Sequence, residues 1–208
     1  MTDSSKPTTK KIGGKTLSAT LAAAVLAIVA SVVSVEGGYV NNPKDPGGAT
    51  NHGVTEKVAR ANGYQGHMRD LPEETAVEIY AADYVTKANF EGIVDLSAAV
   101  GEEVIDSGVN AGTGRSARWF QRSINQLNSP GGCPIVSVDG QVGPATLDAY
   151  SCLMRTRGAR RACQMTIKLM DAQQAQHYMA LVDRDPKFST FIVGWVDHRI
   201  GNVGMNRC

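Results

Sequence analysis

The sequence has almost no excess of charge of either sign, and this absence excludes one broad class of partner. Among its 208 residues, 21 lysines and arginines stand against 20 aspartates and glutamates, which leaves a formal net charge of +1. So small a net charge creates no global field that would attract a polyanion, and we therefore expect no nucleic-acid partner. The hydrophobic fraction of 42% is that of an ordinary globular protein with one core or two small ones.

Ionisable side chains are also absent from one long stretch near the N-terminus. Residues from Thr16 to Val35 carry none, and lysines precede them at positions 6, 10, 11 and 15. As a helix, about twenty residues would reach roughly 30 Å, the thickness of the hydrocarbon core of a bilayer. Lysines on the N-terminal side predict a cytoplasmic N-terminus and an exported body. We therefore expect residues 1–15 to form a disordered basic tail and residues 16–35 to cross the inner membrane once.

The same stretch lacks the leucine content of a permanent anchor, because alanine, serine and threonine make up about half of it. One interpretation is reversible membrane residence, after which the helix joins the catalytic fold. A signal peptide cleaved near Ser34 is a second interpretation. A helix buried in the soluble fold is the third, and it is compatible with the first.

Paired C-x-x-C spacing and helical histidine pairs are both missing, which disfavours a metal site. We expect no metal and no cofactor. The four cysteines lie in the part that would be exported, where an even number favours disulfides. Three pairings are possible. We favour Cys133 with Cys152, which flank a single loop, and Cys163 with Cys208, which would hold the C-terminus.

Strand patterns are weak, and the chain is expected to be mainly α-helical. The run EGGYVNNPKDPGGATNHGVT, residues 36–55, is rich in glycine and proline, which predicts a loop or one small β-hairpin. Apolar spacing typical of helices follows it. The predicted helices are 56–62, 71–89, 96–109, 115–127, 144–155 and 160–182.

Two carboxyl groups near the start of this run are expected to lie in opposite environments. Glu36 would end an apolar helix, where apolar neighbours and the negative end of the helix dipole disfavour its charged form. Asp45 lies in a polar turn beside Lys44 and should stay ionised. Such a pair suits the cleavage of a glycosidic bond. Alternatively, Asp45 is a turn residue that bonds only to its own backbone.

Residues 36–55 resemble the signature of glycoside hydrolase family 108, the phage and bacterial N-acetylmuramidases. Further segments resemble that family's peptidoglycan-binding region and its closing motif, so the resemblance covers nearly everything from Glu36 onward. These segments are Asp106–Gly112, Trp119–Arg122, Asp139–Leu147 and Gly194–Arg199. The resemblance implies a lysozyme-like α fold, a catalytic region over residues 36–105 and a helical peptidoglycan-binding region over residues 106–208.

The resemblance also implies roles for particular residues. Glu36 matches the family's catalytic glutamate. Asp45 and Thr50 stand close to the Glu, Asp and Thr order of phage-type lysozymes, although the spacing to Thr50 is one residue short. Tyr39 and His52 would help to shape the site. Asn110, Asp139 and Gly140 would contact the glycan, although Asp139 and Gly140 could instead form only a helix-entry turn.

The function implied is that of an endolysin that cuts the β-1,4 bond between N-acetylmuramic acid and N-acetylglucosamine. The N-terminal arrangement resembles signal-anchor-release endolysins, which leave the host inner membrane for the periplasm when the membrane potential collapses. We expect such a protein to act as a monomer on peptidoglycan. Two alternatives remain: a membrane-tethered protein that binds the wall without cutting it, and a bacterial muramidase that remodels the wall.

Overall fold

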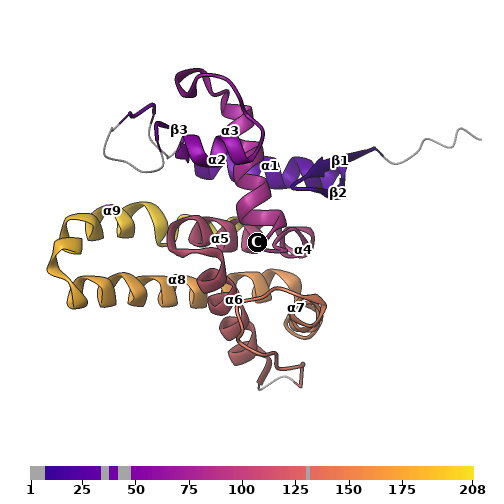
Figure 1. Cartoon of the computed structure of the whole chain (residues 1–208). Helices are drawn as coiled ribbons and strands as arrows, with labels where there is room; N and C mark the ends of the chain where they lie inside the picture. Colours follow the sequence, from indigo (N-terminus) through magenta and orange to yellow (C-terminus); the bar gives the residue numbers. More distant parts are fainter. Residues whose placement is uncertain (1–7, 34–37, 42–47, 130–131) are drawn as a thin grey trace, which may run out of the picture. The chain divides into compact units, whose positions relative to one another are not determined.

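The computed structural model describes residues 8–33, 38–41, 48–129 and 132–208. The chain divides into two compact units, Met1–Lys87 and Ala88–Cys208 (Figure 1). The described parts are mainly helical with short hairpins, which confirms the predicted fold class at that level. The domain boundary predicted between residues 105 and 106 falls inside the helix of residues 98–111, whereas the compact units meet between residues 87 and 88.

Unit 1 begins with a β-hairpin that the sequence analysis did not predict. Strands β1 (Thr9–Ile12) and β2 (Lys15–Ser18) pair antiparallel, with Thr9 opposite Ser18 and Ile12 opposite Lys15. The two-residue turn between them requires glycine, since Gly13 and Gly14 have φ angles of 53° and 84°. The prediction of a disordered tail is therefore wrong for residues 9–15, and in this fold residues 16–18 are strand and not helix.

Helix α1 (Ala19–Val33) packs against α3 and the first hairpin, and one of its faces is buried in unit 1. The buried side chains follow helical spacing and are Ala22, Val25, Ile28, Val29, Val32 and Val33. No helix in the described parts of the chain is long and apolar enough to cross a membrane. The described part of the apolar stretch is thus a strand followed by a core helix of 15 residues.

A second small hairpin follows, as the glycine-rich run predicts. Strands β3 (Thr50–Asn51) and β4 (Val54–Thr55) pair antiparallel. Thr55 then caps α2 (Glu56–Ala61), because its side chain accepts a hydrogen bond from the amide of Val58. After a short 3-10 turn, η1 (Met68–Asp70), comes α3 (Glu73–Tyr80), which continues directly into the π-helical turn η2 (Ala81–Thr86).

Unit 2 is helical throughout its regular elements. It contains α4 (Glu91–Leu96), α5 (Ala98–Ala111), α6 (Thr113–Asn128), α7 (Pro144–Arg157), α8 (Ala159–Arg184) and α9 (Ser189–Arg199), with the 3-10 turns η4 (Pro186–Phe188) and η5 (Met205–Arg207). Figure 1 shows α9 folding back along α8, the longest helix. Phe120 and Tyr150 meet edge to face in the core, with their ring centroids 5.3 Å apart.

Two disulfides cross-link unit 2, with the pairing favoured from the sequence. Cys133 bonds to Cys152, and Cys163 bonds to Cys208. The first bridge fastens the loop before α7 to that helix. The second fastens the C-terminal residue to α8, which fixes the end of the chain in the fold.

Candidate functional site

The two carboxyl groups that the sequence analysis places at the centre of the site, Glu36 and Asp45, lie outside the described residues. Their roles therefore stay predictions. The structure does describe what precedes Glu36. Helix α1 ends at Val33, whose side chain is buried in unit 1, as is that of Val32. The end of α1, three residues before Glu36 in the sequence, is thus held by the core of unit 1.

The second hairpin brings together three of the other residues predicted for this site. Val40 and Thr50 exchange two backbone hydrogen bonds, of 2.8 and 2.7 Å, so the residues next to Tyr39 pair with strand β3. His52 lies at the turn of the same hairpin with a φ angle of 48°, in the left-handed region. Thr50, His52 and the segment carrying Tyr39 therefore share one local structure.

Asn51 holds this hairpin in place and was missed by the sequence analysis. Its side chain is 5% exposed, and its amide nitrogen donates to the carbonyl oxygens of Met68 and Arg69, at 2.9 and 3.2 Å. Its side-chain oxygen accepts from the amide of His52 at 3.1 Å. A buried amide with these bonds fixes both the turn and η1. Asparagine is so common in turns that the sequence alone does not single it out.

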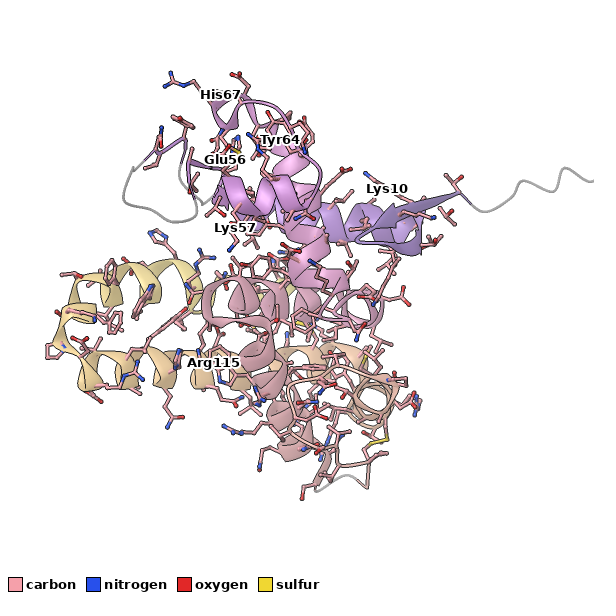
Figure 2. The ribbon with its side chains drawn as sticks, viewed as in Figure 1. Lys10, Glu56, Lys57, Tyr64, His67 and Arg115 are labelled. Atoms are coloured by element: carbon pink, nitrogen blue, oxygen red, sulfur yellow. A yellow bond between two sulfur atoms is a disulfide. The ribbon has the colours of Figure 1, made fainter. Side chains whose placement is uncertain are left out.

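The ring of Tyr39 lies in a cluster of aromatic and cationic groups. The guanidinium carbon of Arg69 lies 4.9 Å from the centre of the ring, within the range of a cation–π contact. The ring of His67 lies 6.3 Å away, centroid to centroid. Figure 2 shows His67 and Tyr64 on the segment that links α2 to α3. Tyr39 thus has one cationic and one aromatic neighbour within unit 1, and its contact with substrate stays a prediction.

A groove of about 190 Å³ runs between the second hairpin and the end of α3. Thr55 lines it from the hairpin, and Tyr80, Asp83 and Tyr84 line it from α3 and η2. The rings of Tyr80 and Tyr84 stack at 5.3 Å, and Asp83 pairs with Lys87 at 2.5 Å. Single-turn π-helices occur frequently at functional sites. The residues of this groove are further candidate site residues. The sequence did not indicate them, because those on α3 and η2 fit the pattern of an ordinary amphipathic helix.

In unit 2, Asp139 and Gly140 form a loop organised by one buried side chain, Gln121. The Gln121 amide nitrogen donates to the Asp139 carboxylate at 2.8 Å, and its oxygen accepts from the Gly140 amide at 2.8 Å. The bond from Gln121, with a second from the amide of Gln141, lowers the pKa of Asp139. These bonds form a turn that precedes α7, and the glycan contact of Asp139 and Gly140 stays a prediction. The loop also borders a groove of about 310 Å³.

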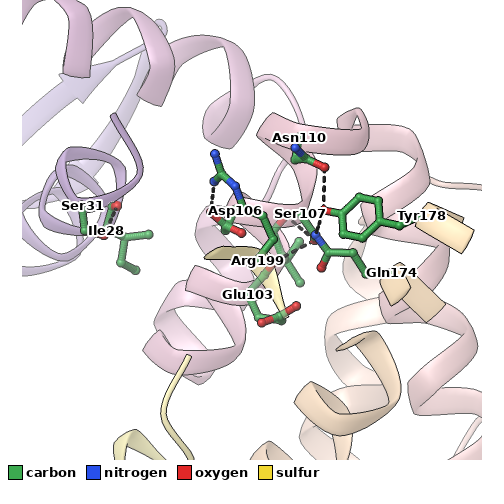
Figure 3. A network of polar contacts seen from close by, with 10 residues as sticks. Ile28, Ser31, Glu103, Asp106, Ser107, Asn110, Gln174, Tyr178 and Arg199 are labelled. Carbon is green, nitrogen blue, oxygen red and sulfur yellow. Dashed lines mark hydrogen bonds and ion pairs between the residues drawn. The ribbon is translucent and has the colours of Figure 1, made fainter. Parts of the chain in front are cut away.

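Asn110, the third residue expected to contact the glycan, belongs to a different network, which joins α5, α8 and α9 (Figure 3). Its side-chain oxygen accepts from the Tyr178 hydroxyl at 2.7 Å, and that hydroxyl accepts from the Gln174 amide at 2.7 Å. Nearby, Arg199 donates to Asp106 at 2.5 Å; the Asp106 side chain is buried, and that of Arg199 is 12% exposed. The visible role of Asn110 is therefore to fix the ring of Tyr178.

Two buried acidic side chains, Asp106 and Glu103, lie at or near this network. Burial raises the pKa of Asp106 despite the neighbouring Arg199 guanidinium. Burial, together with the charges of Asp171 and Asp106, raises the pKa of Glu103 well above its usual value. Within the described ranges, no group of histidine, cysteine or acidic side chains is arranged to hold a metal ion.

The two acids predicted after α1, together with the nearby hairpin of Thr50 and His52, suit the two-carboxyl class of glycoside hydrolase. Comparisons with known proteins narrow this class. Residues 29–112 match the model of glycosyl hydrolase 108, and residues 115–200 match that of a predicted peptidoglycan domain. The chain therefore carries a glycosyl hydrolase 108 domain followed by a predicted peptidoglycan domain, and it is a peptidoglycan-hydrolysing muramidase.

A solved structure supports the same assignment. SagA of Brucella abortus is 28% identical over 90% of this chain and 93% of its own, with a TM-score of 0.56. A comparison with curated proteins found no match. The hydrolase match begins at residue 29, inside α1, so only the last third of this helix belongs to the hydrolase match.

Proposed function

We propose that this muramidase is an endolysin that cuts the β-1,4 bond between N-acetylmuramic acid and N-acetylglucosamine and thereby lyses a host cell. The observation that carries the proposal is the glycosyl hydrolase 108 match, which includes Glu36 and Asp45. Glu36 follows a core helix by three residues and precedes the hairpin of Thr50 and His52. In this proposal the protein acts as a monomer.

In this mechanism Glu36 is the general acid. Its proton passes to the glycosidic oxygen as the bond from that oxygen to the anomeric carbon breaks, and a water oxygen then bonds to that carbon. The carboxylate of Asp45 stabilises the developing positive charge or accepts the proton that the water loses. The Thr50 hydroxyl positions the water. Tyr39 and His52 border the sugar, and Asn110, Asp139 and Gly140 of unit 2 contact the glycan strand.

Glu36→Gln tests this mechanism directly, because a carboxamide cannot donate the proton. We expect hydrolysis of purified peptidoglycan to fall by roughly 10²- to 10⁴-fold while the circular dichroism spectrum is unchanged. Glu74→Gln, on the exposed first turn of α3, is the matched control and should keep full activity. Mass spectrometry of the wild-type digest identifies the bond, since cleavage at the proposed position leaves N-acetylmuramic acid at the reducing end.

Glu36→Gln and the wild-type protein together distinguish the proposed enzyme from the alternative functions. If Glu36→Gln retains more than about a tenth of wild-type hydrolysis, the acid lies elsewhere. A wild-type protein that binds peptidoglycan without releasing fragments would indicate a wall-binding tether. A digest with the expected products is common to an endolysin and a wall-remodelling muramidase, and induced lysis of the host, which only the endolysin should cause, distinguishes them.

We also propose that residues 16–35 hold the newly made chain in the host inner membrane, with the N-terminus in the cytoplasm, until the segment is released and the enzyme folds in the periplasm. The uncharged stretch and the lysines before it support this proposal. Helix α1 alone reaches about 22 Å. A full span therefore requires residues 16–18, which form strand β2 in the fold, to become helical in the membrane.

A further inference from the structure

Helix α9 is unusual within unit 2 because none of its residues is buried, although much of it is apolar. Phe191 is 54% exposed and Val193 is 68% exposed. An apolar helix that gains little from burial contributes little to the fold by itself. Its composition therefore calls for another explanation.

The aromatic side chains at α9 form a row that leads from the core of unit 2 to its surface. Tyr178 of α8, 1% exposed, stacks on the half-buried ring of Trp195 at 4.9 Å and an interplanar angle of 25°. Trp195 in turn stacks on Phe191 at 5.8 Å and 23°. We call Tyr178, Trp195 and Phe191 the α9 ring row. Its outer member is the most exposed of the three rings.

The network of Figure 3 fixes the inner end of this row. The Tyr178 hydroxyl is held by Gln174 and by Asn110, each at 2.7 Å. The last turn of α9 is held by the ion pair of Arg199 with the buried side chain of Asp106. The rings are therefore positioned before any ligand arrives, which lowers the entropy cost of binding.

We propose that the α9 ring row is a stacking platform for the glycan strand of peptidoglycan. The inference rests on the proposed function, and the row lies within residues 115–200, which match the peptidoglycan domain. The face of a β-linked sugar presents weakly positive C–H groups, and the face of an aromatic ring carries the complementary negative charge. Phe191 supplies the contact face, and Trp195 and Tyr178 hold it in position.

The helix also provides its own control position. Phe191 and Trp195 are four residues apart and share one face of α9, whereas Val193 lies on the opposite face. A glycan that stacks on the rings should not depend on Val193. A partner that covers the whole apolar helix, including a second copy of this chain, should depend on both faces.

The experiment measures binding of the full chain to purified sacculi by co-sedimentation, with Glu36→Gln present throughout so that the substrate survives. Phe191→Ala and Trp195→Ala should each weaken binding roughly three- to tenfold, the range of one aromatic contact. Val193→Ala should bind within about twofold of the parent. Because Phe191 is exposed, its loss should leave the melting temperature unchanged and separate binding from folding.

Tryptophan fluorescence gives a second measurement, in a chain whose α9 ring row is intact. The chain has two tryptophans, and Trp119 is only 6% exposed, so quenching by iodide reports mainly Trp195. Soluble oligomers of N-acetylglucosamine should protect Trp195 from iodide in the parent and protect it less in Phe191→Ala.

The inference is overturned if Phe191→Ala binds sacculi as the parent does, if the parent does not bind them, or if Val193→Ala weakens binding equally. A dimer in light scattering that Phe191→Ala dissolves would also overturn it and identify a second copy as the occupant. None of these outcomes affects hydrolysis of soluble fragments, so the muramidase proposal stands or falls separately on Glu36.

Discussion

Single residues in this chain show where sequence reasoning reaches its limit. The turn at Asp139 and Gly140 was expected to contact glycan or to form a helix entry, and the structure shows the bonds that make the entry. This turn is organised by Gln121, which is distant in the sequence and 1% exposed. A glutamine on a helix carries no signal of such a role, because its partners are brought to it only by the tertiary fold.

Glu103 offers a test at this scale. Its side chain is 1% exposed, one carboxyl oxygen has no partner among the described residues, and Asp171 and Asp106 lie near it. Because its pKa is raised in the folded state, its contribution to stability is full below the unfolded pKa. That contribution is lost as the pH rises through the folded pKa.

We therefore expect Glu103→Gln, which keeps the shape without the charge, to be more stable than wild type at pH 8 by about 1 kcal/mol or more. At pH 4 the difference should nearly vanish. Urea unfolding at both pH values measures it, with exposed Glu74→Gln as the control. An equal effect at the two pH values would mean that the ionisation of Glu103 does not influence stability.

At the scale of elements, the sequence predicts long helices well and short strands poorly. The helices predicted over 115–127 and 160–182 are observed as Thr113–Asn128 and Ala159–Arg184, because their apolar spacing extends over several turns. The first hairpin was missed although Gly13 and Gly14 form a two-residue turn. Four-residue strands beside a long apolar run offer too few alternations to compete with the helical pattern.

Helix α1 provides a test of the proposed release from the membrane. Ala23 and Ala27 are exposed on α1, whereas Ala22 is buried, so leucine at the first two positions leaves the packed face intact. Each leucine should add roughly a kilocalorie per mole or more to membrane affinity. The double leucine variant should stay in the membrane fraction after an uncoupler is added and should delay lysis.

The double serine variant at the same two positions is the control and should be released at least as readily as wild type. N-terminal sequencing of the wild-type protein can contradict the release proposal. A mature chain that begins at Val35 or Glu36 would mean that a signal peptidase removes α1 and that no release of an intact helix takes place.

For the whole molecule, the family matches and the compact units divide the chain at different places. The hydrolase match ends at residue 112, whereas the first compact unit ends at Lys87. Helices α4 and α5 therefore belong to the hydrolase match by sequence and to unit 2 by packing. Val104 and Ile105 of α5 are fully buried, and α5 packs on α6 and α8. The sequence could not reveal this overlap, because a resemblance marks homologous segments and not packing.

The two disulfides also concern the whole molecule, and they predict that wall binding and stability can be separated. The bridge from Cys163 to Cys208 closes a segment of 45 residues that contains α9, and the bridge from Cys133 to Cys152 closes one of 19 residues. In the chain-entropy account, removing them costs about 4 and about 3 kcal/mol. Both paired serine variants should thus unfold at lower urea concentration.

Their effects on binding should differ, because α9 has no buried residues and depends on its end contacts to stay in place. Replacing Cys163 and Cys208 by serine should weaken sacculus binding as Phe191→Ala does, under conditions where the variant is folded. The serine pair at Cys133 and Cys152 should bind as the parent does and serves as the control for lost stability. If both pairs weaken binding equally, general loosening of unit 2 is the cause, and the position of α9 has no special part in holding the wall.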